Sequence, residues 1–186
     1  MPVPFKKDFN ITPSPSDMKE RDEILQNSYN NLIYFGRAFL PNDFLKKSES
    51  APFHYQIAKE LITTKPGARI CNIIPRGHGK SVMAKAAIMH KLCFSKTDEQ
   101  HFIAWVSEEQ GQAIDHLKYL RSHFENNKMI KYYFGTMDGG SVGKRWTEKD
   151  IVTAKGDRMI AKGTSQRLRG RAEVDVRYTG IVLDDF

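Results

Sequence analysis

Apolar and polar positions along this chain follow two rhythms, one helical and one typical of buried strands. Apolar residues recur at helical spacing from Arg21 to Leu40, where Pro41 ends the run, and again over 53–63. Residues 1–20 are rich in proline, serine and charge, and we expect them to be extended and poorly ordered. The first third of the chain is therefore predicted to be helical after a polar start.

From residue 69 onward, short apolar runs alternate with helical patterns. The short runs predict strands at 69–74, 101–106, 146–154, 158–162 and 178–183. Helical spacing predicts one helix over 81–94 and another that a capping box at 107–110 opens, with an apolar stripe of Ala113, Leu117, Leu120 and Phe124. Residues 126–143 are glycine-rich and predict an irregular loop. This alternation is typical of an α/β fold with a mostly parallel sheet and helices on both faces.

The composition allows one hydrophobic core with room for a small appendage. The chain has 186 residues, 40% of them hydrophobic and 27% charged, as in ordinary globular domains. No apolar run approaches the roughly 20 residues that span a bilayer, and the start lacks the apolar stretch of a secretory signal. We therefore expect a protein that is neither secreted nor in a membrane. Cys71 and Cys93 are expected to be buried and reduced, and the histidines show no zinc-ligand spacing.

Positive charge is concentrated in the last quarter of the chain. The net charge is +7, and the basic stretch, residues 144–177, carries ten basic and five acidic side chains. Such a concentration predicts a polyanionic partner, of which nucleic acid is the commonest. The alternative is a solvated surface that happens to be rich in lysine and arginine.

One glycine-rich segment carries a specific chemical signal. The glycine loop, residues 75–81, lies between a predicted strand and a predicted helix and reads Pro75-Arg76-Gly77-His78-Gly79-Lys80-Ser81. In a P-loop, glycines let main-chain N–H groups converge on phosphate oxygens at a helix N-terminus, while the lysine reaches the terminal phosphates and the serine ligates magnesium. The loop therefore predicts binding of ATP and Mg²⁺. Ile74 stands where the pattern has glycine, and the alternative is a loop that only caps a helix.

Two acidic residues follow the last predicted strand. Residues 180–183 form a short apolar run, and Asp184 and Asp185 come directly after it. In open α/β sheets, ligands bind at the carboxyl ends of the strands. Beside a P-loop, the first acid would hold magnesium and the second would orient the attacking water. The alternative is a polar strand end that leads into a turn.

Two further segments supply candidate ligands. Gln56, at the end of Phe53-His54-Tyr55-Gln56, would bind an adenine edge, although an exposed glutamine at a helix start is the simpler reading of these residues alone. The segment 163–171 sets arginines between glycines, which would bring a guanidinium close to phosphate, unless it is only a basic surface loop. Arg76, inside the glycine loop, would sense the γ-phosphate or pair with an acid.

In their order along the chain, these four segments resemble the motifs of the ATPase region of the large terminase subunit of tailed bacteriophages, the motor that packages viral DNA. The segment that ends at Gln56 resembles the family's adenine-side glutamine motif. The glycine loop resembles its deviant Walker A, which often lacks the first glycine and carries an arginine. Leu168-Arg169-Gly170-Arg171 resembles the arginine–glycine element upstream of Walker B, and 181–185 resembles Walker B.

The resemblance implies a P-loop NTPase fold of the ASCE type that is truncated after the Walker B strand. Residues 1–50 would form a flexible N-terminus with a helical lid or adaptor segment, and residues 51–186 an incomplete ATPase domain. Arg169 would act as an arginine finger toward a neighbouring subunit, and Asp185 would be the catalytic carboxylate. The implied partners are double-stranded DNA, other terminase subunits in a ring, the small terminase subunit and the portal protein, in the host cytoplasm.

Two departures limit what the resemblance implies. Family members usually have a glutamate at or just after the Walker B acids, whereas Asp185 is the last acid here and is one methylene shorter. The family's C-terminal nuclease has no counterpart, so the chain resembles a fragment or a split gene product and is expected to have little activity alone. A helicase-like DNA-dependent ATPase and a nucleic-acid-binding protein without catalysis are the alternative functions.

Overall fold

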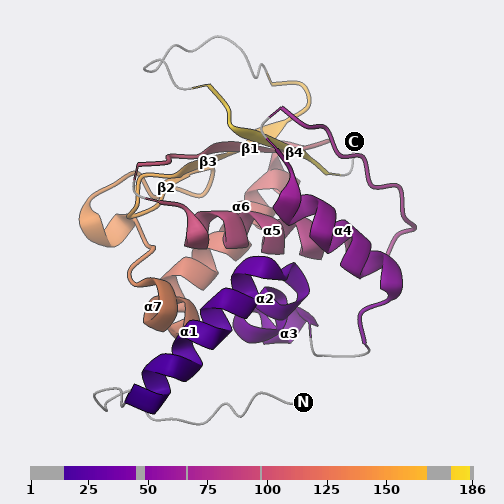
Figure 1. Ribbon diagram of the computed structural model, residues 1–186. Coiled ribbons are helices and arrows are strands. Elements are labelled where there is room, and N and C mark those ends of the chain that lie inside the picture. The colour runs from indigo at the N-terminus through magenta and orange to yellow at the C-terminus, as the bar shows by residue number, and fades with distance from the viewer. Residues whose placement is uncertain (1–14, 45–48, 66, 97, 167–176, 185–186) are drawn as a thin grey trace.

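The helices of this protein gather on one side of an open β-sheet (Figure 1). The structure is a computed structural model that describes residues 15–44, 49–65, 67–96, 98–166 and 177–184. The helices are α1 (Pro15–Asn30), α2 (Leu32–Phe39), α3 (Pro41–Phe44), α4 (Pro52–Thr63), α5 (Lys80–Phe94), α6 (Gln110–Asn126) and α7 (Lys128–Phe134). The strands are β1 (Phe102–Ser107), β2 (Asp150–Val152), β3 (Arg158–Gly163) and β4 (Gly180–Leu183), and a 3₁₀ turn covers Gly140–Val142.

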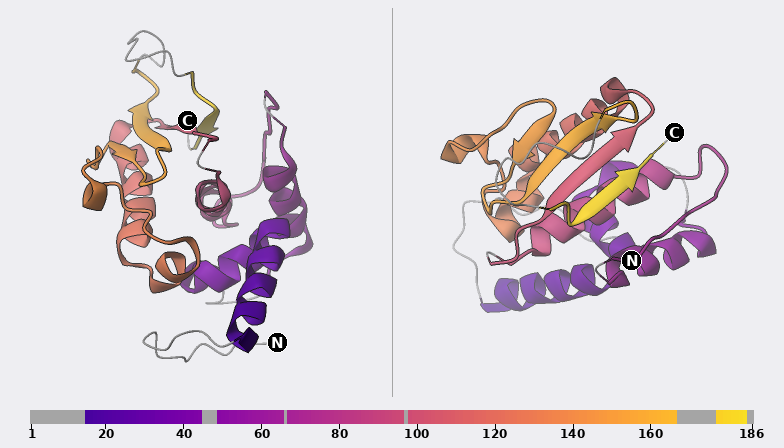
Figure 2. Two further views of the ribbon diagram at one scale, coloured as in Figure 1. Left: turned by 60° about the vertical axis from the view of Figure 1, so that its left-hand side comes forward. Right: turned by 90° about the horizontal axis from the view of Figure 1, so that it is seen from above.

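The described strands form one sheet in the order β2-β3-β1-β4. β1 pairs in parallel with both β3 and β4, while β2 runs antiparallel to β3. Figure 2 shows these strands side by side, with β4 at one edge. The predicted α/β class and mostly parallel sheet are therefore confirmed, and four of the five predicted strands are present, although β2 is shorter than expected.

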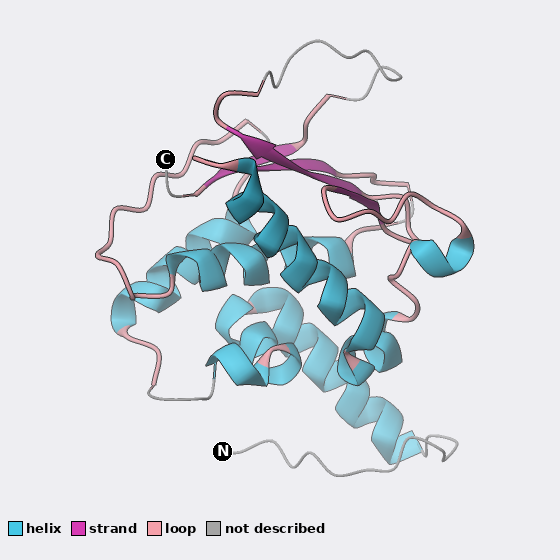
Figure 3. Cartoon of the chain, turned by 180° about the vertical axis from the view of Figure 1, so that it is seen from behind, coloured by secondary structure: helices cyan, strands magenta, loops and turns pink. Residues whose placement is uncertain are grey.

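Side chains of the central strand alternate between the two faces of the sheet, as the pleat requires. Ile103 and Trp105 of β1 join the main core with the helices, whereas Ala104 and Val106 belong to a small cluster on the opposite face. The prediction of helices on both faces is wrong for the described part of the chain, because Figures 1 and 3 show its helices on one face. The alternation of strands and helices along the sequence does not indicate which face of the sheet each helix covers.

Two apolar runs that predicted buried strands are exposed. Ile181 and Leu183 of β4 are 50% and 56% exposed, because β4 is the edge strand and no described helix covers that face. The strand predicted at 69–74 is wrong, since these residues pair with no described strand and Ile73 is 91% exposed. Cys71 is exposed as well, contrary to expectation. An apolar run forms a strand only where a neighbour pairs its N–H and C=O groups.

The N-terminal segment forms two helices where one was predicted. α1 begins at Pro15, inside the segment expected to be extended, and residues 1–14 lie outside the described residues. Asn31 separates α1 from α2 because it is an N-cap, whose side chain accepts a hydrogen bond from the Tyr34 N–H at 3.1 Å. α2 is mostly buried and packs in the main core together with α5.

The two long helices beneath the sheet follow their predicted patterns. α5 covers all of the predicted range 81–94, and Cys93 near its end is buried, as expected. α6 turns its predicted stripe into the core, where all four members are buried: Ala113, Leu117, Leu120 and Phe124. Helical spacing was sufficient for α6 because one face of this helix packs against β1 and β3, whereas α5 packs among α2, α4, α6 and α7.

Two local predictions around α6 are wrong. The capping box at 107–110 does not form, because Ser107 still belongs to β1 and the N-cap of α6, Glu109, makes no side-chain cap bond. The loop predicted at 126–143 contains α7 and the 3₁₀ turn. α7 begins after Asn127, whose side chain accepts hydrogen bonds from two N–H groups of the first turn.

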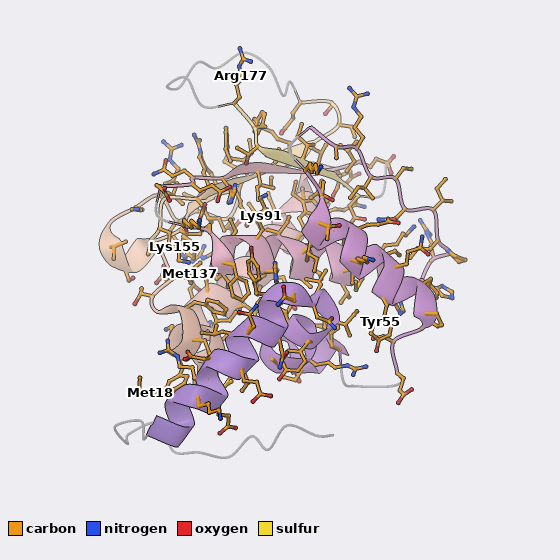
Figure 4. The ribbon with its side chains drawn as sticks, viewed as in Figure 1. Met18, Tyr55, Lys91, Met137, Lys155 and Arg177 are labelled. Carbon is orange, nitrogen blue, oxygen red and sulfur yellow. The ribbon has the colours of Figure 1, made fainter. Side chains whose placement is uncertain are left out.

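The turn between β2 and β3 fastens the sheet to the end of α5. Asp157 is 1% exposed and accepts hydrogen bonds from the His101 N–H at 2.9 Å and from the hydroxyl groups of Ser95 at 2.9 Å and Thr153 at 3.3 Å. The neighbouring Lys155 donates to two carbonyl oxygens at the C-terminal end of α5 (Figure 4). A cation there also opposes the negative end of the helix dipole.

Candidate functional site

The glycine loop turns directly into α5. Gly77 and Gly79 have φ angles of 79° and 78°, in the left-handed region that glycine adopts at little cost. Gly79 is the N-cap of α5, and the Met83 N–H donates to its carbonyl oxygen at 2.9 Å as the first bond of the helix. The N–H groups of residues 80–82 therefore have no partner within α5. Together with the helix dipole, these groups favour an anion at this place.

Lys80 and Ser81, the predicted phosphate and magnesium ligands, are the first two residues of α5 and are half-buried. Their side chains make no hydrogen bond or ion pair with any other described residue. A lysine in the first turn of a helix is unfavourable, because the helix dipole is positive there. The position of Lys80 is therefore explained better by a bound anion than by stability of the helix.

Two histidine rings hold the glycine loop by its carbonyl oxygens. His54, on the first turn of α4, has its Nε2 2.9 Å from the carbonyl oxygen of His78. The Ala51 N–H donates to Nδ1 of the same ring at 3.0 Å. The His78 ring has its Nδ1 2.9 Å from the carbonyl oxygen of Arg76. α4 and the glycine loop, which lie 24 residues apart in the chain, are thus in direct contact.

Gln56 does not make the contact between α4 and the loop. Its amide donates to Glu60 at 3.3 Å, one turn further along the same helix, and the residue is exposed. The neighbouring Tyr55 is also exposed, and its hydroxyl accepts a hydrogen bond from Arg37 of α2 at 3.4 Å. The residue of α4 that contacts the loop is His54, which was not predicted; its place in the third position of α4, after Pro52, was the available signal.

Asp184 is the last described residue and follows β4 directly. Its N–H donates to the Val106 carbonyl oxygen at 2.9 Å, which continues the pairing with β1, and the residue is 8% exposed. Oδ2 of Asp184 lies 3.3 Å from Nε2 of His116 on α6 but accepts no hydrogen bond from a described residue. The His116 ring stacks on Trp105, with ring centroids 4.5 Å apart. Sequence reasoning missed His116, since nothing local connects it to Asp184.

Lys85 is a half-buried cation on α5. It lies one turn after Ser81 on the same helix, and its ammonium stands 4.1 Å from the centroid of the Tyr119 ring. Burial lowers the pKa of Lys85, while the charges of Asp43 and Asp184 act in the opposite direction.

Mg²⁺ fits the donors that these elements offer. Magnesium prefers oxygen ligands and is usually bound by one or two carboxylates together with phosphate oxygens. Asp184 has a buried carboxylate oxygen without a hydrogen bond, and Ser81 has a hydroxyl at the start of α5. Within the described ranges, no three His, Cys, Asp or Glu side chains form a group that could hold a metal by themselves. Nor does a hydrogen bond or ion pair join Asp184 to the glycine loop there.

The basic stretch is partly occupied by structural contacts. Arg145 and Arg158 form ion pairs with Asp150 at 2.7 and 2.8 Å. Burial alone would raise the pKa of the Asp150 carboxyl, but the hydrogen bonds from the two arginines lower it overall. Arg177 extends away from the helices, above the sheet in Figure 4. Fewer of the ten basic side chains in this stretch are therefore available to bind a polyanion than their number indicates.

Two predicted catalytic residues lie outside the described residues. These are Arg169, the implied arginine finger, and Asp185, the implied catalytic carboxylate. The structure brings the glycine loop into contact with α4 through His54, which was not a predicted site residue, and joins neither Gln56 nor Asp184 to the loop by a hydrogen bond or ion pair among the described residues.

Comparisons with known proteins provide no further constraint. No family model, characterised protein or solved structure matches this chain. None of the described helices is both long enough and apolar enough to cross a membrane. The choice of function therefore depends on the geometry of the glycine loop and of the carboxyl end of β4.

Proposed function

We propose that this chain binds ATP with Mg²⁺ at the glycine loop, as the ATPase region of a phage terminase large subunit that drives viral DNA into a procapsid. The observation that carries the proposal is the junction of the loop with α5, where unpaired N–H groups, a helix dipole and Lys80 meet. All three favour a polyanion such as a triphosphate. The assignment to the terminase family depends on the four motif resemblances and their order in the chain.

In this proposal, the residues at the start of α5 bind the nucleotide. The N–H groups of residues 80–82 donate to phosphate oxygens, and Lys80 neutralises charge on the terminal phosphates. Ser81 and Asp184 hold Mg²⁺, which supplies positive charge between the phosphates when it is bound. His116 holds the Asp184 carboxylate near the place where that charge is needed.

The remaining proposed residues act on the transferred phosphoryl group or on the base. Asp185 orients the attacking water, while Arg76 and Arg169 stabilise charge that develops in the transition state. Gln56 binds the adenine edge after it leaves Glu60. DNA, further terminase subunits, the small subunit and the portal are the partners of the assembled motor.

Binding of a fluorescent ATP analogue to the purified chain tests the nucleotide site. We expect weak binding that requires Mg²⁺ and is lost with a chelator, and slow or undetectable phosphate release. Turnover is expected to be slow because the last acid, Asp185, is one methylene shorter than glutamate, and because no hydrogen bond or ion pair joins Asp184 to the glycine loop among the described residues. Absence of any nucleotide binding would refute the site, and brisk DNA-stimulated hydrolysis would refute the expected inactivity of the isolated chain.

Replacing Arg169 with alanine tests the subunit-crossing role that the resemblance implies. We expect Arg169→Ala to leave ATP affinity unchanged and to reduce the part of phosphate release that rises more than linearly with protein concentration. Arg177→Ala, in the same basic stretch, serves as the control and should leave that part unchanged. A loss of ATP affinity in Arg169→Ala would show that the guanidinium binds within its own subunit.

The basic stretch favours a second candidate function, nucleic-acid binding without catalysis. Ten basic residues against five acidic ones provide the charge for salt-sensitive DNA binding. DNA binding that falls steeply with salt and does not respond to ATP would support this function over the ATPase.

A further inference from the structure

The two hydrogen-bond partners of His54 define one tautomer of its neutral ring. The Ala51 N–H donates to Nδ1, so Nδ1 carries a lone pair and the proton of the neutral ring is on Nε2. Nε2–H therefore donates to the carbonyl oxygen of His78 at 2.9 Å. The ring acts as a fixed link from the backbone of α4 to the backbone of the glycine loop.

A held carbonyl sets the direction of the next N–H group. A trans peptide is planar, and its C=O and N–H bonds point in opposite directions; the described chain has no cis peptide bond. Because His54 holds the carbonyl of residue 78, the Gly79 N–H points away from α4. The His78 ring holds the carbonyl of Arg76 in the same way, so the direction of the Gly77 N–H is fixed as well.

Both of these N–H groups belong to glycines with positive φ, at the positions where the loop turns toward α5. They make no hydrogen bond within the described part of the chain. Neighbouring main-chain N–H groups in a turn form a concave site for anions. A glycine-rich loop is intrinsically free to rotate its peptides, so its affinity for an anion depends on what restrains them.

We infer that His54 is a positioning residue for the phosphate site: it holds the peptide between residues 78 and 79 so that the Gly79 N–H faces the triphosphate. The inference rests on the proposed nucleotide site and identifies the group that orients its backbone. The segment Phe53-His54-Tyr55-Gln56 then has two functions: His54 positions the glycine loop, and Gln56 binds the adenine edge. A ring that merely capped α4 would need only its Nδ1 contact.

Two substitutions separate the link to the loop from the helix cap. In His54→Gln, the amide nitrogen replaces the Nε2 donor, whereas in His54→Asn the carbonyl oxygen replaces the Nδ1 acceptor and the donor is lost. We expect His54→Asn to weaken binding of Mg-ATP about fivefold, the equivalent of one neutral hydrogen bond. His54→Gln should stay within about twofold of the unchanged protein. Lys59→Gln, at an exposed position of α4, is the control for charge and surface changes.

Inorganic tripolyphosphate tests the phosphate site without the base. We expect the same loss of affinity for tripolyphosphate as for ATP in His54→Asn, since the effect is on phosphate contacts. In spectra of protein with ¹⁵N-labelled glycine, the Gly77 and Gly79 amide signals should shift on addition of tripolyphosphate and Mg²⁺ to the unchanged protein. In His54→Asn, the Gly79 shift should be smaller, while the Tm should be no lower than that of His54→Gln, which loses the Nδ1 acceptor of the α4 cap.

The outcomes distinguish this inference from the proposed function. If the unchanged protein binds neither ATP nor tripolyphosphate, the nucleotide site and the role of His54 both fail. If it binds both and His54→Asn binds equally well, the nucleotide site stands and the role of His54 fails. A loss of affinity and of stability in His54→Gln but not in His54→Asn would also overturn the inference, because it would assign His54 to the cap of α4 alone.

Discussion

Lys80→Ala should strongly weaken nucleotide binding without lowering the free energy of unfolding. We expect the affinity for Mg-ATP to fall about ten- to hundredfold, because hydrogen bonds to charged groups contribute roughly 1.5–3 kcal/mol. The free energy of unfolding should stay the same or rise slightly, because the substitution removes a cation from the positive end of the α5 dipole. Titration with a fluorescent ATP analogue and thermal unfolding measure the two effects separately.

Lys91→Ala is the matched control, on the last turn of the same helix (Figure 4). It should leave ATP affinity unchanged and cost about 0.3–1 kcal/mol of stability, since a cation at that end of α5 is favourable. If the nucleotide affinity of Lys80→Ala is within twofold of that of the unchanged protein, the glycine loop does not bind phosphate in the proposed way.

The largest loss of stability is expected from Asp157→Ala. This substitution removes a buried carboxylate that accepts hydrogen bonds from one main-chain N–H and two hydroxyl groups, and it leaves the His101 N–H without its partner. We expect a loss of about 3 kcal/mol, which lowers the Tm by about 6–12 °C in a domain of this size. Differential scanning calorimetry measures the change directly.

Asp157→Asn should fall between the unchanged protein and Asp157→Ala, because the amide keeps one oxygen as an acceptor. Asp98→Ala, at an exposed position before β1, is the control and should change the Tm by only a small amount. If Asp157→Ala lowers the Tm no more than Asp98→Ala does, then the turn is not what fastens the β2–β3 hairpin to α5.

Helical periodicity was the most reliable predictor of this fold. The stripe from Ala113 to Phe124 lies in the core because α6 packs one face against β1 and β3, and the small apolar residues of α5 lie there because α2 and α4 pack around it. Periodicity failed where a second partner decides the outcome. Ile70 and Ile73 of the run at 69–74, and Ile181 and Leu183 of β4, are as apolar as residues of buried strands, yet they are exposed.

Caps and short helices were predicted poorly for a related reason. Residues 107–110 fit a capping box, but pairing of Ser107 in β1 takes that residue out of the helix start. Asn127 was not recognised as the cap of α7, although its type is a common N-cap. Which of several polar residues caps a helix depends on where the preceding element ends.

The sequence by itself determined the glycine loop, since only glycine adopts the backbone angles of residues 77 and 79 without strain, and Lys80 follows directly. It also predicted the helix that follows the loop, α5, but not that the residues before the loop pair with no described strand. The tertiary structure alone decided the contacts of His54 with the loop and of His116 with Asp184, which join residues 24 and 68 positions apart. Local patterns carry no information on such pairs, because packing of separate elements brings them together.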